Sequence, residues 1–202
     1  MSGRGTFLLF LLATLIGAGV PIALLRPANL SVLQTILYGS ERVSEFQNVS
    51  LGASMDAVRY AKGSASNFLV ADNSGSEWQL WIPAAAIGEG QYAEKKDSDF
   101  NGWGWDEESK RVEVTFDPKA KTVSAIDCYD DKGIGSCSVD GIVTGDSEVE
   151  VVGVLGVAAE RHLAAGGSTL RIDVKSLNLS VFLTKKKVYM ISIRDLRKSP
   201  KL

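Results

Sequence analysis

The chain has few of the side chains that usually build metal and catalytic sites. It contains one histidine and two cysteines in 202 residues, whereas a structural zinc site takes four nitrogen, sulfur or oxygen ligands. Lysine plus arginine (22) nearly balance aspartate plus glutamate (24), so the basic excess that releases counterions from nucleic-acid phosphates is missing. We therefore expect no metal, no other cofactor and no nucleic-acid partner.

Apolar sequence, by contrast, is abundant. Hydrophobic residues make up 45% and charged residues 23% of the chain, as in folded globular proteins. Residues 7–25 carry no charge, and as a helix they would span about 28 Å, close to the core of a bilayer. We expect an uncleaved membrane anchor at 1–26, in preference to a cleaved signal peptide. A stalk follows at 27–47, with a short helix whose apolar positions are Leu30, Leu33, Ile36 and Leu37.

The two cysteines, Cys128 and Cys137, lie nine positions apart across a glycine-containing segment. Such a segment can bring their Cα atoms within disulfide range, and disulfides persist in oxidising compartments. Two unrelated buried thiols are the alternative. A disulfide places the soluble part outside the cytoplasm. Together with the expected anchor, this predicts an inner (cytoplasmic) membrane protein that crosses the bilayer once and has its soluble part in the periplasm.

A short motif occurs twice. Residues 51–65, L-G-A-S-M-D-A-V-R-Y-A-K-G-S-A, and residues 144–158, T-G-D-S-E-V-E-V-V-G-V-L-G-V-A, share the frame G-x-S-x-x-x-V-x-x-x-x-G-x-A. The first glycine permits a tight turn, the serine caps a helix, the valine points into the core, and the second glycine ends the helix. The predicted structural motif is Gly52, Ser54, Val58 and Gly63, repeated as Gly145, Ser147, Val151 and Gly156.

Each motif is followed by segments that alternate with a period of two, as half-buried antiparallel strands do. The fold class predicted is α+β: an N-terminal transmembrane helix plus a tandem repeat of short helices packed on an antiparallel β-meander. The first helix-plus-sheet repeat is expected at 48–138 and the second at 139–202. The expected strands are 78–82, 112–116, 123–126, 170–174, 177–183 and 188–193.

The first motif, with V-E-V-T-F-D and V-S-A-I-D after it, resembles the SmpA/OmlA family of small outer-membrane lipoproteins, which includes an accessory subunit of the barrel-assembly machinery. In tandem, the pattern is similar to the β-lactamase-inhibitor-protein fold, which is built from two such repeats. The similarity extends over about residues 48–128 and 141–196, although the lipoprotein cysteine is absent. The resemblance implies a non-enzymatic interaction module of the bacterial envelope.

The segment 97–108 combines glycines and acids with the aromatic residues Phe100, Trp103 and Trp105. Exposed aromatic side chains in loops are typical binding anchors, so we predict that these three residues bind a partner. The alternative is that the rings fold back onto the sheet near Trp78 and Trp81.

The single histidine, His162, is expected in a short helix or turn, and no nucleophile motif accompanies it. The sequence therefore predicts that the protein is not an enzyme and has no catalytic residue. The expected function is a membrane-anchored envelope protein that binds another envelope or membrane protein, as an accessory subunit of a membrane complex. The alternatives are a binder of lipid or cell-wall fragments, which needs an apolar groove between the repeats, and a hydrolase using His162 and a carboxylate.

Overall fold

The structure is a computed structural model that describes residues 43–70, 80–155, 159–163 and 167–195. Two helices of eight residues, α3 (Met55–Lys62) and α4 (Glu148–Leu155), are set among strands. Short 3-10 helices are η2 (Ala84–Ala86), η3 (Gly90–Tyr92), η4 (Asp97–Asp99) and η6 (Lys175–Leu177). The strands are β1 (Glu45–Phe46), β2 (Val49–Ser50), β3 (Asn67–Val70), β4 (Leu80–Pro83), β5 (Gly102–Asp106), β6 (Arg111–Phe116), β7 (Val123–Tyr129), β8 (Ser138–Val139), β9 (Ile142–Val143), β10 (Glu160–Leu163), β11 (Thr169–Val174), β12 (Leu179–Thr184) and β13 (Lys187–Arg194).

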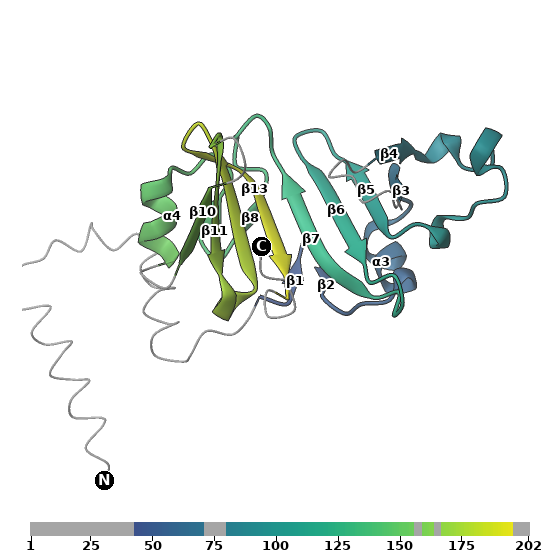
Figure 1. Cartoon of the computed structure of the whole chain (residues 1–202), viewed down its shortest axis with the longest axis horizontal. Helices are drawn as coiled ribbons and strands as arrows, with labels where there is room; N and C mark the ends of the chain where they lie inside the picture. Colours follow the sequence, from purple (N-terminus) through teal and green to yellow (C-terminus); the bar gives the residue numbers. More distant parts are fainter. Residues whose placement is uncertain (1–42, 71–79, 156–158, 164–166, 196–202) are drawn as a thin grey trace, which may run out of the picture.

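Nine of these strands form one antiparallel sheet in the order β10-β11-β12-β13-β7-β6-β5-β3-β4 (Figure 1). Strands β7 and β13 meet in the middle and pair from Met190 opposite Tyr129 to Arg194 opposite Ala125. The remaining strands make two small hairpins, β1–β2 and β8–β9. We call β3 to β7 with α3 the first half, and β10 to β13 with α4 the second half.

The predicted fold class is wrong. The described chain is mostly β-structure, and the two expected meanders are one continuous sheet because β7 and β13 pair edge to edge. Each of these strands would otherwise present a row of unpaired backbone groups to solvent. The segment around His162, expected to be helix or turn, is the edge strand β10, which pairs with β11.

The predicted membrane anchor at 7–25 lies outside the described residues. Within the described ranges, neither α-helix is long and apolar enough to cross a membrane, since eight residues give about 12 Å of helix against a hydrocarbon core of about 30 Å. This finding contradicts three predictions: a transmembrane helix, a signal anchor and a single-pass inner-membrane location.

The two halves share a local arrangement around their helices. A hairpin precedes each helix, and a glycine with a positive φ follows the hairpin, 81° at Gly52 and 95° at Gly145. The Gly52 N–H donates to the carbonyl of Val123 at 2.8 Å, and the Gly145 N–H donates to that of Val188 at 2.8 Å. The start of each helix is thereby attached to the last strand of its own half.

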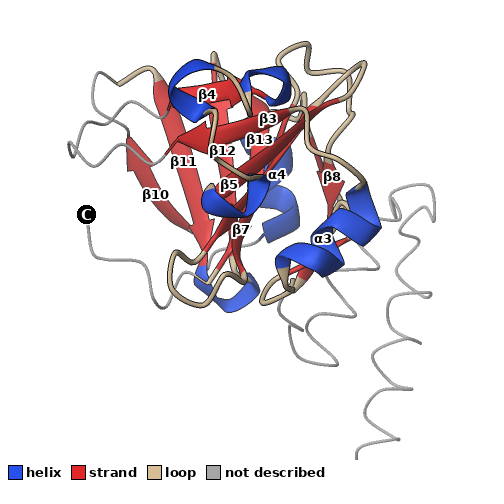
Figure 2. Ribbon diagram, turned by 90° about the vertical axis from the view of Figure 1, so that its right-hand side faces the viewer, coloured by secondary structure: helices blue, strands red, loops and turns tan. Residues whose placement is uncertain are grey.

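The core lies between the helices and one face of the sheet (Figure 2). Val58 of α3 and Val151 of α4 are both buried and belong to the same apolar cluster as Val114 and Ile191 from the middle strands. We call this the helix side of the sheet, and the opposite surface the open face.

Candidate functional site

The strands of the sheet separate apolar from polar side chains with a period of two. On β6, the buried Val112 and Val114 alternate with Arg111 and Glu113. Because successive side chains of a strand point to opposite faces, Arg111 and Glu113 lie on the open face. Residues directly opposite each other on paired strands lie on the same face. The register of the neighbouring strands therefore places their polar side chains on the open face as well.

A row of cross-strand neighbours, which we call the polar row, crosses this face from β10 to β3. Its charges are paired: the Arg194 Nη2 donates to Asp127 at 2.9 Å, and the Arg171 Nε donates to Asp173 at 2.7 Å. The members of the polar row are Glu160, Asp173, Ser180, Ser192, Asp127, Glu113, Gly104 and Asn67.

At the first-half end of the polar row, the Trp81 ring of β4 lies across the neighbouring strands. A Cβ atom on Gly104 would come within 3.2 Å of this ring, and one on Gly102 would collide with the side chain of Leu69 and come within 3.3 Å of the ring. The two glycines of β5 therefore leave the space that Leu69 and Trp81 occupy. The guanidinium of Arg111 stacks over the ring at 4.9 Å from its centroid. The same guanidinium forms an ion pair with Glu113 at 2.6 Å.

Burial and neighbouring acids perturb two groups beside this stack. Burial raises the pKa of Glu113, Arg111 opposes the shift, and Asp127 on the adjacent strand adds to it. Burial also raises the pKa of Tyr129, together with the charges of Asp127 and Glu113. Tyr129 therefore stays protonated at neutral pH, and its hydroxyl donates to Glu113.

These residues line a hollow of about 530 Å³ on the open face. Trp81, Arg111, Glu113 and Tyr129 form one part of its lining, and the rest comes from the β5–β6 turn and from residues just after β7, such as Lys132. The hollow therefore combines aromatic rings with charges of both signs. Such a lining suits a mixed polar and aromatic contact rather than an apolar ligand.

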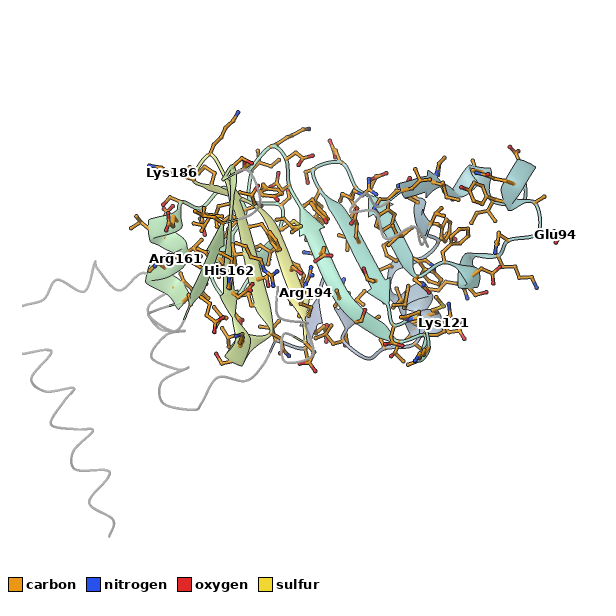
Figure 3. All side chains as sticks on the ribbon, viewed as in Figure 1. Glu94, Lys121, Arg161, His162, Lys186 and Arg194 are labelled. Atoms are coloured by element: carbon orange, nitrogen blue, oxygen red, sulfur yellow. A yellow bond between two sulfur atoms is a disulfide. The ribbon has the colours of Figure 1, made fainter. Side chains whose placement is uncertain are left out.

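The second-half end of the polar row carries His162 (Figure 3). Its Nε2 lies 3.6 Å from Asp173 and 3.8 Å from Glu160, and the side chain is 46% exposed. The nearby hydroxyl of Ser180 is fully buried and donates to Asp173 at 2.6 Å. An acid–base pair that activates a nucleophile needs that hydroxyl to donate to the histidine, so the geometry gives the hydrolase hypothesis no support.

The three aromatic residues predicted to bind a partner lie in the core. Phe100, Trp103 and Trp105 are 5%, 1% and 6% exposed, and both tryptophans belong to strand β5. Trp103 packs edge-on against Phe116 at 5.0 Å, and its Nε1 donates to the carbonyl of Asp97 at 3.0 Å. The structure thus places these rings in the core on the helix side, as in the alternative that they fold back onto the sheet.

The motif residues take part in the start and end of each helix. The Ser54 hydroxyl accepts from the N–H of Ala57 at 3.2 Å, and the Gly63 N–H donates to the carbonyl of Arg59 at 2.8 Å. Ser147 and Glu150 cap α4 reciprocally, with the Ser147 N–H donating to the Glu150 carboxylate at 2.7 Å. Gly156 lies outside the described residues.

A disulfide joins Cys128 of β7 to Cys137, with the Cα atoms 6.0 Å apart. The chain between the cysteines wraps around the side chain of Asp130, which is 1% exposed. Its carboxylate accepts from the hydroxyl of Thr144 and from the backbone N–H groups of Lys132, Gly133, Ile134 and Ser136. Burial alone would raise the pKa of Asp130, but these donors hold it below its ordinary value.

Across the described ranges, no group of three or more histidine, cysteine, aspartate or glutamate side chains is arranged to hold a metal ion. The two hollows described on the molecule, one on the open face and one of about 340 Å³ beside α3, are both lined by first-half residues and the loops next to them.

Sequence reasoning missed the cluster of Trp81, Arg111, Glu113 and Tyr129. The signal was present in two alternating patterns. R-V-E-V on β6 places an arginine and a glutamate on one face, and G-W-G-W on β5 places two glycines on that same face. Two adjacent bare positions beside an arginine leave room for a large ring, which Trp81 supplies.

In comparisons with known proteins, the chain matches no family model, no curated protein and no solved structure.

Proposed function

We propose that the protein is a non-enzymatic protein–protein interaction module whose open face receives another protein of the cell envelope. The observation that carries the proposal is the stack of Arg111 on Trp81 beside Glu113 and Tyr129. Tryptophan, tyrosine and arginine are the residue types that supply most of the binding energy in protein interfaces. A rigid sheet presents them with little loss of side-chain entropy on binding.

Two further features support this function. The charges of the polar row are already paired within the chain, so an approaching protein meets a preorganised surface. The disulfide between Cys128 and Cys137 suits a chain that folds in an oxidising compartment, where envelope partners are found. The short motif that resembles the SmpA/OmlA family favours the same class of function.

The test is co-purification with the tagged full chain from cells that produce it. Arg111→Gln removes the charge that stacks on the ring, and Trp81→Ala removes the ring. We expect both variants to lose the same co-purifying proteins, by tenfold or more. Tyr60→Ala is the matched control, because Tyr60 is 95% exposed on α3 on the helix side and its loss should leave recovery unchanged.

Thermal unfolding of each variant shows whether the fold survives the substitution. Recovery that is the same for wild type, both open-face variants and the control contradicts the proposal. Recovery that falls only in the control contradicts it as well, and assigns binding to the helix side.

A further inference from the structure

The arginines of the open face lie outside the acids with which they pair. In each of three ion pairs the carboxylate side chain is nearly buried, at 7%, 11% and 9% exposed, whereas its arginine is 19%, 31% and 33% exposed. The pairs, in this order, are Arg171 with Asp173, Arg194 with Asp127, and Arg111 with Glu113. A protein that approaches this face therefore meets guanidinium groups first, with the carboxylates beneath them.

The three arginines are distributed across the middle of the sheet. They stand on β11, β13 and β6, with one strand between each of them and the next. Each lies two positions along its strand from a member of the polar row, so all three side chains belong to the open face. From Arg171 to Arg111 there are four strand spacings, or about 19 Å. One partner can therefore contact all three arginines at once.

Apolar and aromatic side chains occupy the row between the two outer arginines. Arg171 lies opposite Phe182, and Met190 follows on the next strand. Met190 in turn lies opposite Tyr129, which lies opposite Arg111. The face thus has an apolar centre between two cationic groups, as protein interfaces have an apolar core and a polar rim.

The arginines also keep donors that this chain does not use. A guanidinium carries N–H donors on all three of its nitrogen atoms. Within the described part of the chain, Arg171 donates only through Nε, and Arg194 donates through Nε and Nη2. The Nη groups that remain can donate to a second carboxylate, and hydrogen bonds between arginine and carboxylate are among the stronger ones.

We propose that the partner of the open face contacts it through an acidic surface, with its carboxylates set against Arg171, Arg194 and Arg111. This names the chemistry of the partner in the function proposed above and rests on that function. Protein carboxylates are favoured over a charged membrane, because each arginine already lies on an acid and the long-range attraction of the face is small. Short-range hydrogen bonds from the planar guanidinium to individual carboxylates remain.

Binding of fluorescein-labelled poly-glutamate to the purified full chain tests the proposal at low salt, where surface charges are least screened. Whole pairs are replaced, so that no buried acid loses its partner and the net charge stays the same. Arg171→Gln with Asp173→Asn should weaken binding threefold or more, as should Arg194→Gln with Asp127→Asn. All four substitutions together should weaken it tenfold or more, since distant sites act additively.

The matched control is Lys185→Gln with Lys186→Gln. Both lysines are exposed in the β12–β13 turn, so this variant loses two positive charges outside the proposed contact. We expect its binding of poly-glutamate to change by less than twofold. Thermal unfolding of each variant shows whether the fold survives.

Three results overturn the proposal: no binding of poly-glutamate to the wild type, equal binding by the wild type and the pair variants, and an equal loss in the lysine control. Vesicles of phosphatidylglycerol and phosphatidylcholine form a parallel arm. Binding to these vesicles that depends on the same arginines more strongly overturns the proposal in favour of a lipid surface. Failure of the function proposed above is distinct, because it leaves co-purification unchanged in Trp81→Ala and Arg111→Gln, which are not used here.

Discussion

Strands β5 and β11 occupy equivalent places in the two halves of the sheet, and both send apolar side chains to the core, but they place different residues on the open face. Trp103 pairs with Val114 of β6 as Ile172 pairs with Val181 of β12. In β5 the large side chains fill the core and glycines face the open side. In β11 branched aliphatic residues fill the core, and an arginine and an aspartate face the open side.

The difference shows what each half can offer a partner. Gly102 and Gly104 leave a bare strip of backbone that Leu69 and Trp81 cover, and Arg111 stacks on the Trp81 ring. On β11 the corresponding positions hold Arg171 and Asp173, which pair with each other at 2.7 Å. Both halves pair their open-face arginine with an acid and place it over an aromatic ring, since Arg171 lies 5.7 Å from the centroid of Phe182. The first half differs in its bare glycines and in the larger indole ring of Trp81.

On the other side of the sheet, the two helices also differ in the residues that they turn outward. Helix α3 turns Asp56, Arg59 and Tyr60 outward, whereas α4 turns Val149 and Gly153 outward beside Glu150. The shared residues are those that attach helix to strand, such as Gly52 and Gly145. The comparison shows that the two halves share the contacts that join the start of each helix to a strand. The outward positions of the helices do not take part in these contacts, so their residues can differ between the halves.

The largest expected effect follows from the tryptophans of β5. Trp103→Ala should lower the free energy of unfolding by about 4 kcal/mol, because Trp103 is 1% exposed and its removal empties the centre of an aromatic cluster. Ile172→Ala at the equivalent position of β11 should cost less, about 3 kcal/mol. Urea denaturation measures both, and a cost below about 1 kcal/mol for Trp103→Ala would show that the ring is not a core element.

The repeated glycines provide a second test, because one of the two positions is crowded. A Cβ atom at Gly145 would collide with the carbonyl oxygen of Gly133, whereas a Cβ atom at Gly52 meets nothing within 4 Å. Gly52→Ala should cost about 1 kcal/mol, the strain of a positive φ. Gly145→Ala should cost about 3 kcal/mol, since the loop closed by the disulfide must move as well.

Equal losses for the two glycine variants in urea denaturation would contradict this crowding. Reducing the disulfide checks whether the closed loop is the cause of the larger cost. Once the loop is free to shift, the free energies of unfolding lost in Gly145→Ala and in Gly52→Ala should become more similar.

The cage around Asp130 lies in the connection between the two halves, just after β7, and gives a pH-dependent prediction. Its folded pKa lies below the ordinary 3.8, so the stabilisation is present above that value and is lost as the pH falls through the folded pKa. Asp130→Asn should cost about 2 kcal/mol at pH 7. The difference between wild type and variant should shrink as the pH falls below about 4, and a constant difference down to pH 2 would exclude the charge as its source.

Local patterns were sufficient to predict most strands of the sheet. Period-two alternation located the strands that became β6, β7, β11, β12 and β13 within a few residues. This alternation could not predict that β7 pairs with β13. The contact joins residues more than 60 positions apart, and it depends on which strand edges remain unpaired. A spacing of nine residues likewise left open whether Cys128 and Cys137 form a bond.

Strand β5 was misjudged for a physical reason. Glycine is depleted in strands, so G-W-G-W was interpreted as a loop with exposed rings. Here the glycines are favourable because the side chains of Leu69 and Trp81 fill the space above them. The tryptophans between them consequently point into the core, and the candidate site lies on the opposite face from the residues predicted for it.

The helix caps give the smallest expected effect and the closest comparison between the halves. Ser54→Ala should cost about 1 kcal/mol, because the Ser54 hydroxyl is the side-chain cap of α3. Ser147→Ala should cost about half as much, since the Glu150 carboxylate still accepts from the Ser147 N–H at 2.7 Å. Adding Glu150→Ala to Ser147→Ala should raise the loss to that of Ser54→Ala or beyond. If Ser147→Ala alone already costs as much as Ser54→Ala in urea denaturation, the reciprocal cap does not compensate, and the two helices begin in energetically equivalent ways.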